Sequence, residues 1–187
     1  MHEEFARIGR DLWASGAVSS HGGNMSVRDG GRLLITSTGS MLGHLQEGDV
    51  IETALTECGD PRDMRCSVEL VVHRAIYAAT DARAIVHAHT VDTIVRSLVS
   101  DRIVPADSES VLRLTDVPVV SARETVGSPE AGALLAEALR DRRIAVLRGH
   151  GPFAVGDSLE DAFQAISCLE ASCRILNTLE ALKTASR

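Results

Sequence analysis

The sequence has few aromatic residues and no excess of positive charge. Aromatic side chains make up 3% of the 187 residues, and 19 Lys and Arg stand against 26 Asp and Glu, for a formal net charge of −7. Scarce aromatics argue against a platform for stacking nucleic-acid bases, and a dedicated nucleic-acid binder should carry a basic face. An anionic ligand must therefore be held by a local set of donors rather than by a general positive field.

The chain also lacks signals for a membrane span or a thiol site. No apolar run approaches the roughly 20 residues that cross a bilayer, and the acidic start is unlike a signal peptide. The four cysteines form no C-x-x-C pair, so neither a thiolate zinc site nor a redox dithiol is indicated; they are Cys58, Cys66, Cys168 and Cys173. We expect a cytoplasmic protein with reduced cysteines and no membrane partner.

Apolar segments of two kinds alternate along the chain. Segments at helical spacing or with helix-cap residues predict helices over 5–12, 68–76, 90–99, from 129 onward, and 158–182. Short apolar runs bounded by turn residues predict strands over 25–28, 32–36, 84–86, 117–120, 144–147 and 153–155. This order suits one α/β domain with a mixed sheet covered by helices.

Three histidines follow two of the predicted strands. His87 and His89 are two residues apart at the end of the strand 84–86, so their side chains share one face. His150 follows the strand 144–147 and has a glycine on each side, which lets the backbone come close and aims the ring. Together they supply the three nitrogens of a catalytic zinc site, which keeps a fourth position open.

A carboxylate and a further histidine lie at the start of a predicted helix that Ser67 can cap. Glu69 suits a helix N-terminus electrostatically, and near a metal it serves as a fourth ligand or a general acid/base. His73 lies on the same helix face, four residues on, and we interpret it as an orienting partner or a core residue.

Glycines and hydroxyl residues cluster in two further segments. Gly23 and Asn24 lie in the first, and Thr38 and Gly39 in the second. Such segments expose N–H groups and hydroxyls that bind phosphate without basic side chains. Ser67, at a helix N-terminus, can complete the anion site.

These pieces, in their order and spacing, resemble the class II aldolase/adducin family, in its L-fuculose-1-phosphate aldolase type. The matching segments are Gly23-Asn24-Met25-Ser26, Thr36-Ser37-Thr38-Gly39, Ser67-Val68-Glu69, His87-Ala88-His89 and Gly149-His150-Gly151. The resemblance implies a single three-layer α/β/α domain over residues 1–187, with a mixed, largely antiparallel central sheet. It also implies a homotetramer whose active sites lie between subunits.

The resemblance assigns roles to individual residues. It implies one zinc ion per subunit, held by His87, His89 and His150, with Glu69 as a ligand that swings away to move protons. It places the substrate phosphate on Gly23, Asn24, Thr38, Gly39 and Ser67. The implied reaction cleaves a phosphorylated ketose to dihydroxyacetone phosphate and a short aldehyde, through an enediolate stabilised by the metal.

Two positions depart from the family pattern. Val68 stands where a second Ser is usual, which removes one hydroxyl from the phosphate site. The fuculose enzyme also uses a tyrosine from the adjacent subunit, whereas the alignment places Glu109 there and Tyr77 lies on the Glu69 helix. Glu109 is therefore expected to act as the acid for the aldehyde oxygen; Asp107 is the alternative, unless the substrate differs.

Other interpretations stay open. His21, just before the glycine pair, either reaches the substrate or is a turn residue. The same metal set also serves a pentulose-phosphate 4-epimerase, a sugar-acid-phosphate decarboxylase or a thioribulose-phosphate dehydratase. A non-catalytic, adducin-like interaction module needs no metal, and the presence of all three histidines with Glu69 argues against it.

Overall fold

The strands form one mixed sheet. A computed structural model describes residues 2–56 and 59–186, and none of the helices in these ranges is long and apolar enough to cross a membrane. The sheet order is β3-β2-β1-β4-β8-β7-β6-β5; all neighbours are antiparallel except β6 and β7. The strands are β1 (Asn24–Asp29), β2 (Arg32–Thr36), β3 (Val50–Ala54), β4 (Ala84–His87), β5 (Arg102–Ile103), β6 (Val117–Val120), β7 (Ile144–Leu147) and β8 (Gly151–Gly156).

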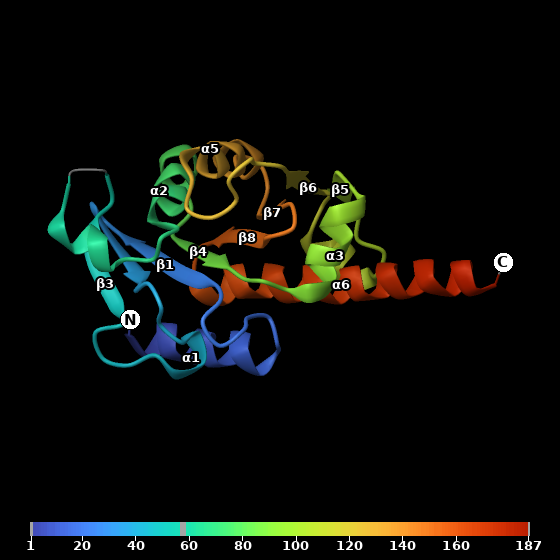
Figure 1. Cartoon of the computed structure of the whole chain (residues 1–187), viewed down its shortest axis with the longest axis horizontal. Helices are drawn as coiled ribbons and strands as arrows, with labels where there is room; N and C mark the ends of the chain where they lie inside the picture. The colour runs from blue at the N-terminus through green and yellow to red at the C-terminus, as the bar shows by residue number, and fades with distance from the viewer. Residues whose placement is uncertain (1, 57–58, 187) are drawn as a thin grey trace.

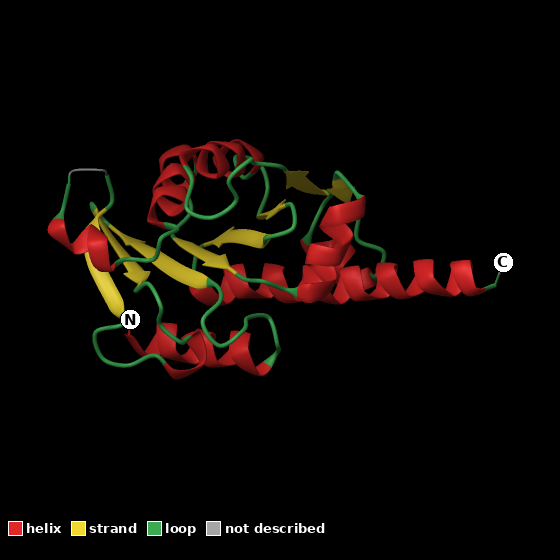
Figure 2. Ribbon diagram, in the orientation of Figure 1, coloured by secondary structure: helices red, strands yellow, loops and turns green. Residues whose placement is uncertain are grey.

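Helices cover both faces of this sheet (Figure 2). In Figure 1, α2 and α5 lie on one side of the strands and α1 and α6 on the other. The α-helices are α1 (His2–Ala14), α2 (Leu70–Ala79), α3 (Val91–Val99), α4 (Ser108–Arg113), α5 (Pro129–Ala138) and α6 (Leu159–Ala185), and the 3-10 helices are η1 (Leu42–His44) and η2 (Pro61–Arg65). The expected three-layer α/β/α domain with a largely antiparallel sheet is confirmed.

The alternation of side chains in the central strands separates the two layers of core. Val86 and Ala154 belong to the cluster that contains α1 and α6, whereas Ile85 and Phe153 belong to the cluster that contains α2 and α5. Successive residues of a strand face opposite sides, so each apolar strand is buried on both faces. A fully buried Ile or Phe contributes about 1.5–3 kcal/mol to stability, and this fixes the register of β4 against β8.

Several elements differ from the sequence-based expectation. Helix α2 begins at Leu70, two residues later than expected, because Val68 and Glu69 form a turn that precedes it. The short elements β3, β5, α4, η1 and η2 were not expected. Of the four cysteines, Cys66, Cys168 and Cys173 are free, and Cys58 lies outside the described residues.

Candidate metal centre and active site

The three predicted histidines converge at one end of the central strands. The distances between their Nε2 atoms are 3.0 Å for His87 and His89, 3.1 Å for His87 and His150, and 3.2 Å for His89 and His150. His87 ends β4 and His89 follows it, while His150 lies in the short turn that joins β7 to β8. Since β4 pairs with β8, residues about 60 positions apart in sequence become neighbours.

The other ring nitrogens show that the converging atoms carry lone pairs. His87 Nδ1 donates to the carbonyl of Pro152 at 3.0 Å, and His150 Nδ1 donates to the carbonyl of Thr125 at 2.7 Å. A neutral imidazole carries one proton, so the Nε2 atoms of both rings are acceptors. Lone pairs that face one another at 3 Å repel, and a cation among them removes the repulsion.

The environment keeps these imidazoles in the form that binds metal. Burial, followed by the neighbouring rings, lowers the pKa of His89 to about 4 and the pKa of His87 well below its usual value. Burial also lowers the pKa of His150. Tetrahedral zinc, with Zn–N bonds of about 2.0–2.1 Å, separates its ligand nitrogens by about 3.3 Å. The observed spacings fit such an ion.

Glu69 lies at the edge of this cluster with one oxygen unpartnered. Its Oε1 is 3.8 Å from His150 Nε2 and accepts a hydrogen bond from the N–H of Gly127 at 3.3 Å. Its Oε2 is buried and has no hydrogen-bond partner among the described residues. Burial raises the pKa of this carboxyl to about 7, which the Gly127 N–H partly opposes. The carboxylate is placed to ligate a cation or to hold a proton.

The predicted anion-binding residues come together beside the histidines. Asn24 begins β1 opposite His87 of β4. The turn after β2 approaches the start of α2, because Ser37 bridges to Cys66, Ser67 N–H donates to the Thr36 carbonyl at 3.0 Å, and Thr38 N–H donates to the Arg65 carbonyl at 3.1 Å.

This region has fewer backbone N–H groups free to bind an anion than the sequence suggested, but the free ones lie close to the start of α2. Thr38 N–H is used internally, whereas the N–H groups of Gly39 and Val68 donate no hydrogen bond within the described residues. Ser67 Oγ accepts from Glu69 N–H at 3.2 Å, which leaves its own hydrogen to donate. The side chain of Val68 is exposed and cannot replace a hydroxyl, but its backbone N–H is available.

Gly23 allows this close approach of strands. It adopts φ +76°, and a Cβ there would lie 2.7 Å from the carbonyl oxygen of His87. Only glycine fits such a position without strain.

His73 does not orient a metal ligand. Its Nε2 is 2.6 Å from Asn24 Oδ1 and its Nδ1 is 2.6 Å from Ser26 Oγ, and the ring is fully buried. Its contacts are instead with Asn24, a predicted anion-binding residue, and with Ser26.

Three other predicted candidates lie apart from the histidine cluster or at its rim. Glu109 is exposed on α4, where its Oε1 contacts Cys168 Sγ of α6 at 3.9 Å, and Asp107 caps the start of α4. Neither contacts the histidines within the described part of this chain. His21 is exposed and contacts Ser20 Oγ at 3.0 Å. It precedes Gly22, whose added Cβ would lie 2.9 Å from His89 Nδ1, so His21 is close to the centre.

Sequence reasoning missed the loop that joins β6 to α5. Through the carbonyl of Thr125 and the N–H of Gly127, this loop holds both His150 and Glu69. It also missed Phe153, whose ring stacks on His87 with centroids 3.9 Å apart. One signal for this loop was present in the sequence, namely the glycine directly before the Ser-Pro helix start. In the structure this residue, Gly127, adopts φ +58°.

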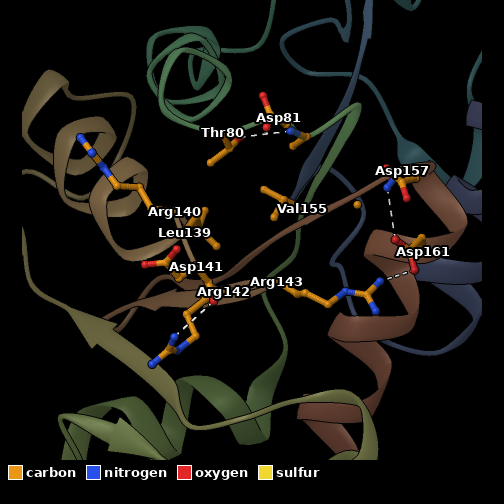
Figure 3. Close-up of a pocket in the computed structure, with 12 residues that line it drawn as sticks. Thr80, Asp81, Leu139, Arg140, Asp141, Arg142, Arg143, Val155, Asp157 and Asp161 are labelled. Carbon is orange, nitrogen blue, oxygen red and sulfur yellow. Dashed lines mark hydrogen bonds and ion pairs between the residues drawn. The ribbon is translucent and has the colours of Figure 1, made fainter.

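A second cavity, of about 550 Å³, lies at the opposite end of β4 and β8 (Figure 3). Its rim carries Arg140, Arg142 and Arg143, and each arginine pairs with a carboxylate: Glu137, Asp116 and Asp161, respectively. The three arginines of this cavity are therefore already paired with carboxylates. We place the candidate functional residues at the histidine cluster instead.

Comparison with known proteins shows one family over most of the chain. The model of a family described as "Class II Aldolase and Adducin N-terminal domain" matches residues 3–177. A crystal structure of L-fuculose-1-phosphate aldolase from Thermus thermophilus superposes with a TM-score of 0.92 at 38% identity, covering 98% of this chain and 95% of that chain.

Curated relatives carry three different activities in their names. An L-fuculose phosphate aldolase of Methanocaldococcus jannaschii is 33% identical over 95% of this chain and 97% of its own length. A 3-oxo-tetronate 4-phosphate decarboxylase of Escherichia coli is 29% identical over 94% of this chain and 85% of its own length. A probable bifunctional methylthioribose-1-phosphate isomerase/methylthioribulose-1-phosphate dehydratase of Nocardia farcinica is 30% identical over 91% of this chain, which spans only 34% of that protein.

Proposed function

The chain belongs to the class II aldolase and adducin family, and on that premise we propose that it is a zinc-dependent aldolase acting on a phosphorylated ketose. The proposed substrate is like L-fuculose 1-phosphate, and the products are dihydroxyacetone phosphate and a short aldehyde. The observation that carries the proposal is the convergence of three imidazole Nε2 atoms beside a buried carboxylate and a set of free anion donors.

His87, His89 and His150 are the residues that would hold the metal, with Glu69 as a further ligand. A bound divalent cation supplies a Lewis acid that polarises a carbonyl and stabilises the negative charge of an enediolate. The neutral, all-nitrogen histidine set suits zinc among the divalent ions. The carbonyls of Pro152 and Thr125 aim two of the rings and fix their tautomers.

The phosphate group is proposed to lie on uncharged donors. Asn24, the hydroxyls of Thr38 and Ser67, and the N–H groups of Gly39 and Val68 provide them, and Gly23 permits the close approach. Such an arrangement binds an anion in a chain of net charge −7.

Glu69 is proposed to move the proton. Its pKa of about 7 lets the carboxyl hold or release a proton near neutral pH, which is what a general acid/base needs. The unpartnered Oε2 is free to give a proton to the enediolate in cleavage, or to take one in synthesis.

We propose a homotetramer with active sites between subunits. Exposed apolar side chains surround the centre and the adjacent α3, and among them are Val68, Val91, Val95, Leu98, Val99 and Val126. Patches of this kind mark protein–protein contacts. A neighbouring copy would then supply Glu109 as the acid for the aldehyde oxygen. The free, buried Cys66, Cys168 and Cys173 support the proposed cytoplasmic location.

A second candidate is decarboxylation or dehydration of a related sugar phosphate. The buried position of the tyrosine favours this candidate. Tyr77, the one tyrosine of the sequence, is buried within α2 with its hydroxyl bound to Ser26. It is not available to take the proton from the hydroxyl that becomes the aldehyde in cleavage, or to return it to the aldehyde oxygen in synthesis. The decarboxylase and the dehydratase named above match nearly all of this chain, as the aldolase does. The identity of the product therefore has to decide between the three reactions.

The deciding experiment uses zinc-loaded protein with L-fuculose 1-phosphate and related ketose 1-phosphates, with the products identified by NMR. Dihydroxyacetone phosphate should appear with the phosphorylated ketose, and the free sugar should give no cleavage products. A decarboxylated, dehydrated or epimerised product would replace the aldolase proposal by its alternative.

Metal analysis tests the remaining, non-catalytic possibility. We expect one zinc ion per chain after reconstitution, and loss of that stoichiometry in His89→Ala but not in His21→Ala. A protein that binds no divalent ion would be an interaction module instead.

A further inference from the structure

A buried hydrogen-bond chain leads from α2 to the anion site. It runs from Tyr77 Oη to Ser26 Oγ at 2.9 Å, from Ser26 Oγ to His73 Nδ1 at 2.6 Å, and from His73 Nε2 to Asn24 Oδ1 at 2.6 Å. All four side chains are at least 94% buried. No step proposed above uses Tyr77, Ser26 or His73.

The chain of hydrogen bonds has one direction in which every buried proton finds an acceptor. Burial raises the pKa of Tyr77, so its hydroxyl stays protonated, and Ser26 Oγ is its one partner among the described residues. Tyr77 must therefore donate to Ser26, Ser26 must donate to His73 Nδ1, and His73 must carry its proton on Nε2. The reverse direction would leave the buried Tyr77 proton without an acceptor, which is costly.

The direction fixes the Asn24 amide. A donating His73 Nε2–H requires the oxygen of the amide, so Asn24 Oδ1 faces α2 and the Nδ2 group faces away from it. No group in the described residues accepts a hydrogen bond from Nδ2, and Nδ2 is not among the buried unpartnered atoms. Its two N–H donors are therefore accessible, beside His87 on the neighbouring strand.

We propose that His73 is a positioning residue that holds the Asn24 amide with its Nδ2 group toward the bound phosphate. The inference rests on the proposed function, because it assigns Asn24 to an anion. Without His73, the amide is free to rotate by 180° and to present its oxygen, an acceptor that repels phosphate. Tyr77 and Ser26 do not contact the phosphate; they act on the phosphate site by fixing the orientation of His73.

The first test reads the tautomer in the full-length, zinc-loaded protein. Nitrogen-15 NMR of the histidine side chains should show His73 as neutral and protonated on Nε2, whereas protonation on Nδ1 would overturn the inference. This measurement needs no variant that has to fold.

The second test measures the affinity of zinc-loaded variants for inorganic phosphate by calorimetry. His73→Leu should weaken binding about tenfold, the loss expected of one hydrogen bond to a charged group. His73→Gln should restore most of it, because the Gln amide donates to Asn24 and accepts from Ser26. Tyr77→Phe should weaken binding by a smaller factor, and zinc content should stay unchanged in all three.

A double variant separates positioning from general stability. Combining His73→Leu with Asn24→Ala should weaken phosphate binding no more than Asn24→Ala alone, since His73 acts through Asn24. Losses that multiply, or a His73→Leu variant that binds phosphate normally while Asn24→Ala does not, would overturn the inference and leave the proposed function standing. An Asn24→Ala variant with unchanged phosphate affinity would instead contradict the proposed anion site and the inference together.

Discussion

Glu69 has one oxygen that accepts a backbone hydrogen bond and one oxygen without a hydrogen-bond partner among the described residues, and its two proposed roles depend on that difference. Glu69→Gln keeps the size and the Gly127 contact but removes the titrating group. We expect the variant to keep its zinc on the three histidines and to lose turnover by about 100-fold or more, the usual contribution of a general acid/base. Steady-state kcat and metal stoichiometry, measured on one preparation, check this; wild-type turnover in the variant would reduce Glu69 to a helix-start carboxylate.

His73 makes stability depend on pH. Burial lowers its pKa to about 3, whereas in the unfolded chain it titrates near 6.5. Below pH 6.5 the unfolded state binds a proton that the folded state does not, so the free energy of unfolding falls as the pH drops from 6.5 toward 3. At pH 5.5 this residue accounts for about 1 kcal/mol of the loss, and a pH unit or more above 6.5 for almost none.

Urea unfolding of wild type and His73→Gln at pH 8 and pH 5.5 tests this share. The decrease between the two pH values should be smaller in the variant by about 1 kcal/mol. An equal decrease in both proteins would show that other groups, such as His87 and His89, carry the whole dependence.

At the scale of residues, the sequence predicted side chains better than backbone contacts. His87 and His89 were identifiable because residues two apart at a strand end share one face, whereas His150 is brought to them by the pairing of β4 with β8. The partners that aim them, the carbonyls of Pro152 and Thr125, were not, because every residue carries a carbonyl and its direction depends on the folded loop. His73 was interpreted as an orienting partner or a core residue; it is fully buried, and its Nε2 contacts Asn24 Oδ1 on β1, 49 positions away in sequence.

Among the elements, the loop from Ser121 to Ser128 has the greatest influence on the site. Gly127 in this loop has φ +58°, and an added Cβ would lie 2.5 Å from the Val68 carbonyl oxygen. We expect Gly127→Ala to push the loop away from α2, to weaken the hydrogen bond to Glu69, and to lower kcat about tenfold or more while zinc still binds.

Gly30→Ala is the matched control for this change. Gly30 has the same φ of +58° in the β1–β2 turn, with no atom within 4 Å of the added Cβ. In both variants, an alanine in the left-handed backbone conformation should lower the free energy of unfolding by about 1–2 kcal/mol. Thermal unfolding should show this loss in each. Only Gly127→Ala should lose activity; equal losses would mean that backbone strain, and not the contact with Val68, is responsible.

Element prediction succeeded where a helix cap or a continuous apolar run marked the element. Helix α6 follows the cap residue Ser158, strands β4 and β7 contain continuous apolar runs, and all three were found with the correct type. β5 has two residues and α4 has six, too short for a period to emerge. β3 reads VIETA, and its half-buried edge position in the sheet, beyond β2, comes from tertiary pairing.

The whole molecule has one long extension. The C-terminal half of α6 projects beyond the sheet (Figure 1), and it exposes Ile175, Leu179 and Leu182 near the apolar residues of α3. We expect this surface to be covered in the proposed tetramer, so that Leu179→Glu lowers the mass measured by sedimentation.

Met64→Glu serves as the control, because Met64 is 89% exposed on η2 and also apolar. That variant should keep the wild-type mass. If both variants sediment as the wild type does, α6 lies outside any subunit interface.

At this scale the resemblance carried more information than composition did. The order of short motifs predicted the three-layer domain that the sheet order confirms, and the arithmetic of charge predicted only that an anion needs local donors. The assembly could not be derived in the same way, because the apolar residues of α3 and α6 have the same pattern whether they face a core or a partner.

The placement of the site on the sheet has a consequence for its motions. The three histidines lie at the end of the central strand β4, just after it, and in the tight turn before β8, whereas Glu69 Oε1 accepts a hydrogen bond of 3.3 Å from Gly127 in a loop. In hydrogen–deuterium exchange, the amides of β4 and β8 should exchange slowly, and those of residues 121–128 should exchange orders of magnitude faster. Strands β4 and β8 would hold the ion in place while the Glu69 carboxyl moves. The rate at which the loop opens would then limit how fast this carboxyl can change position.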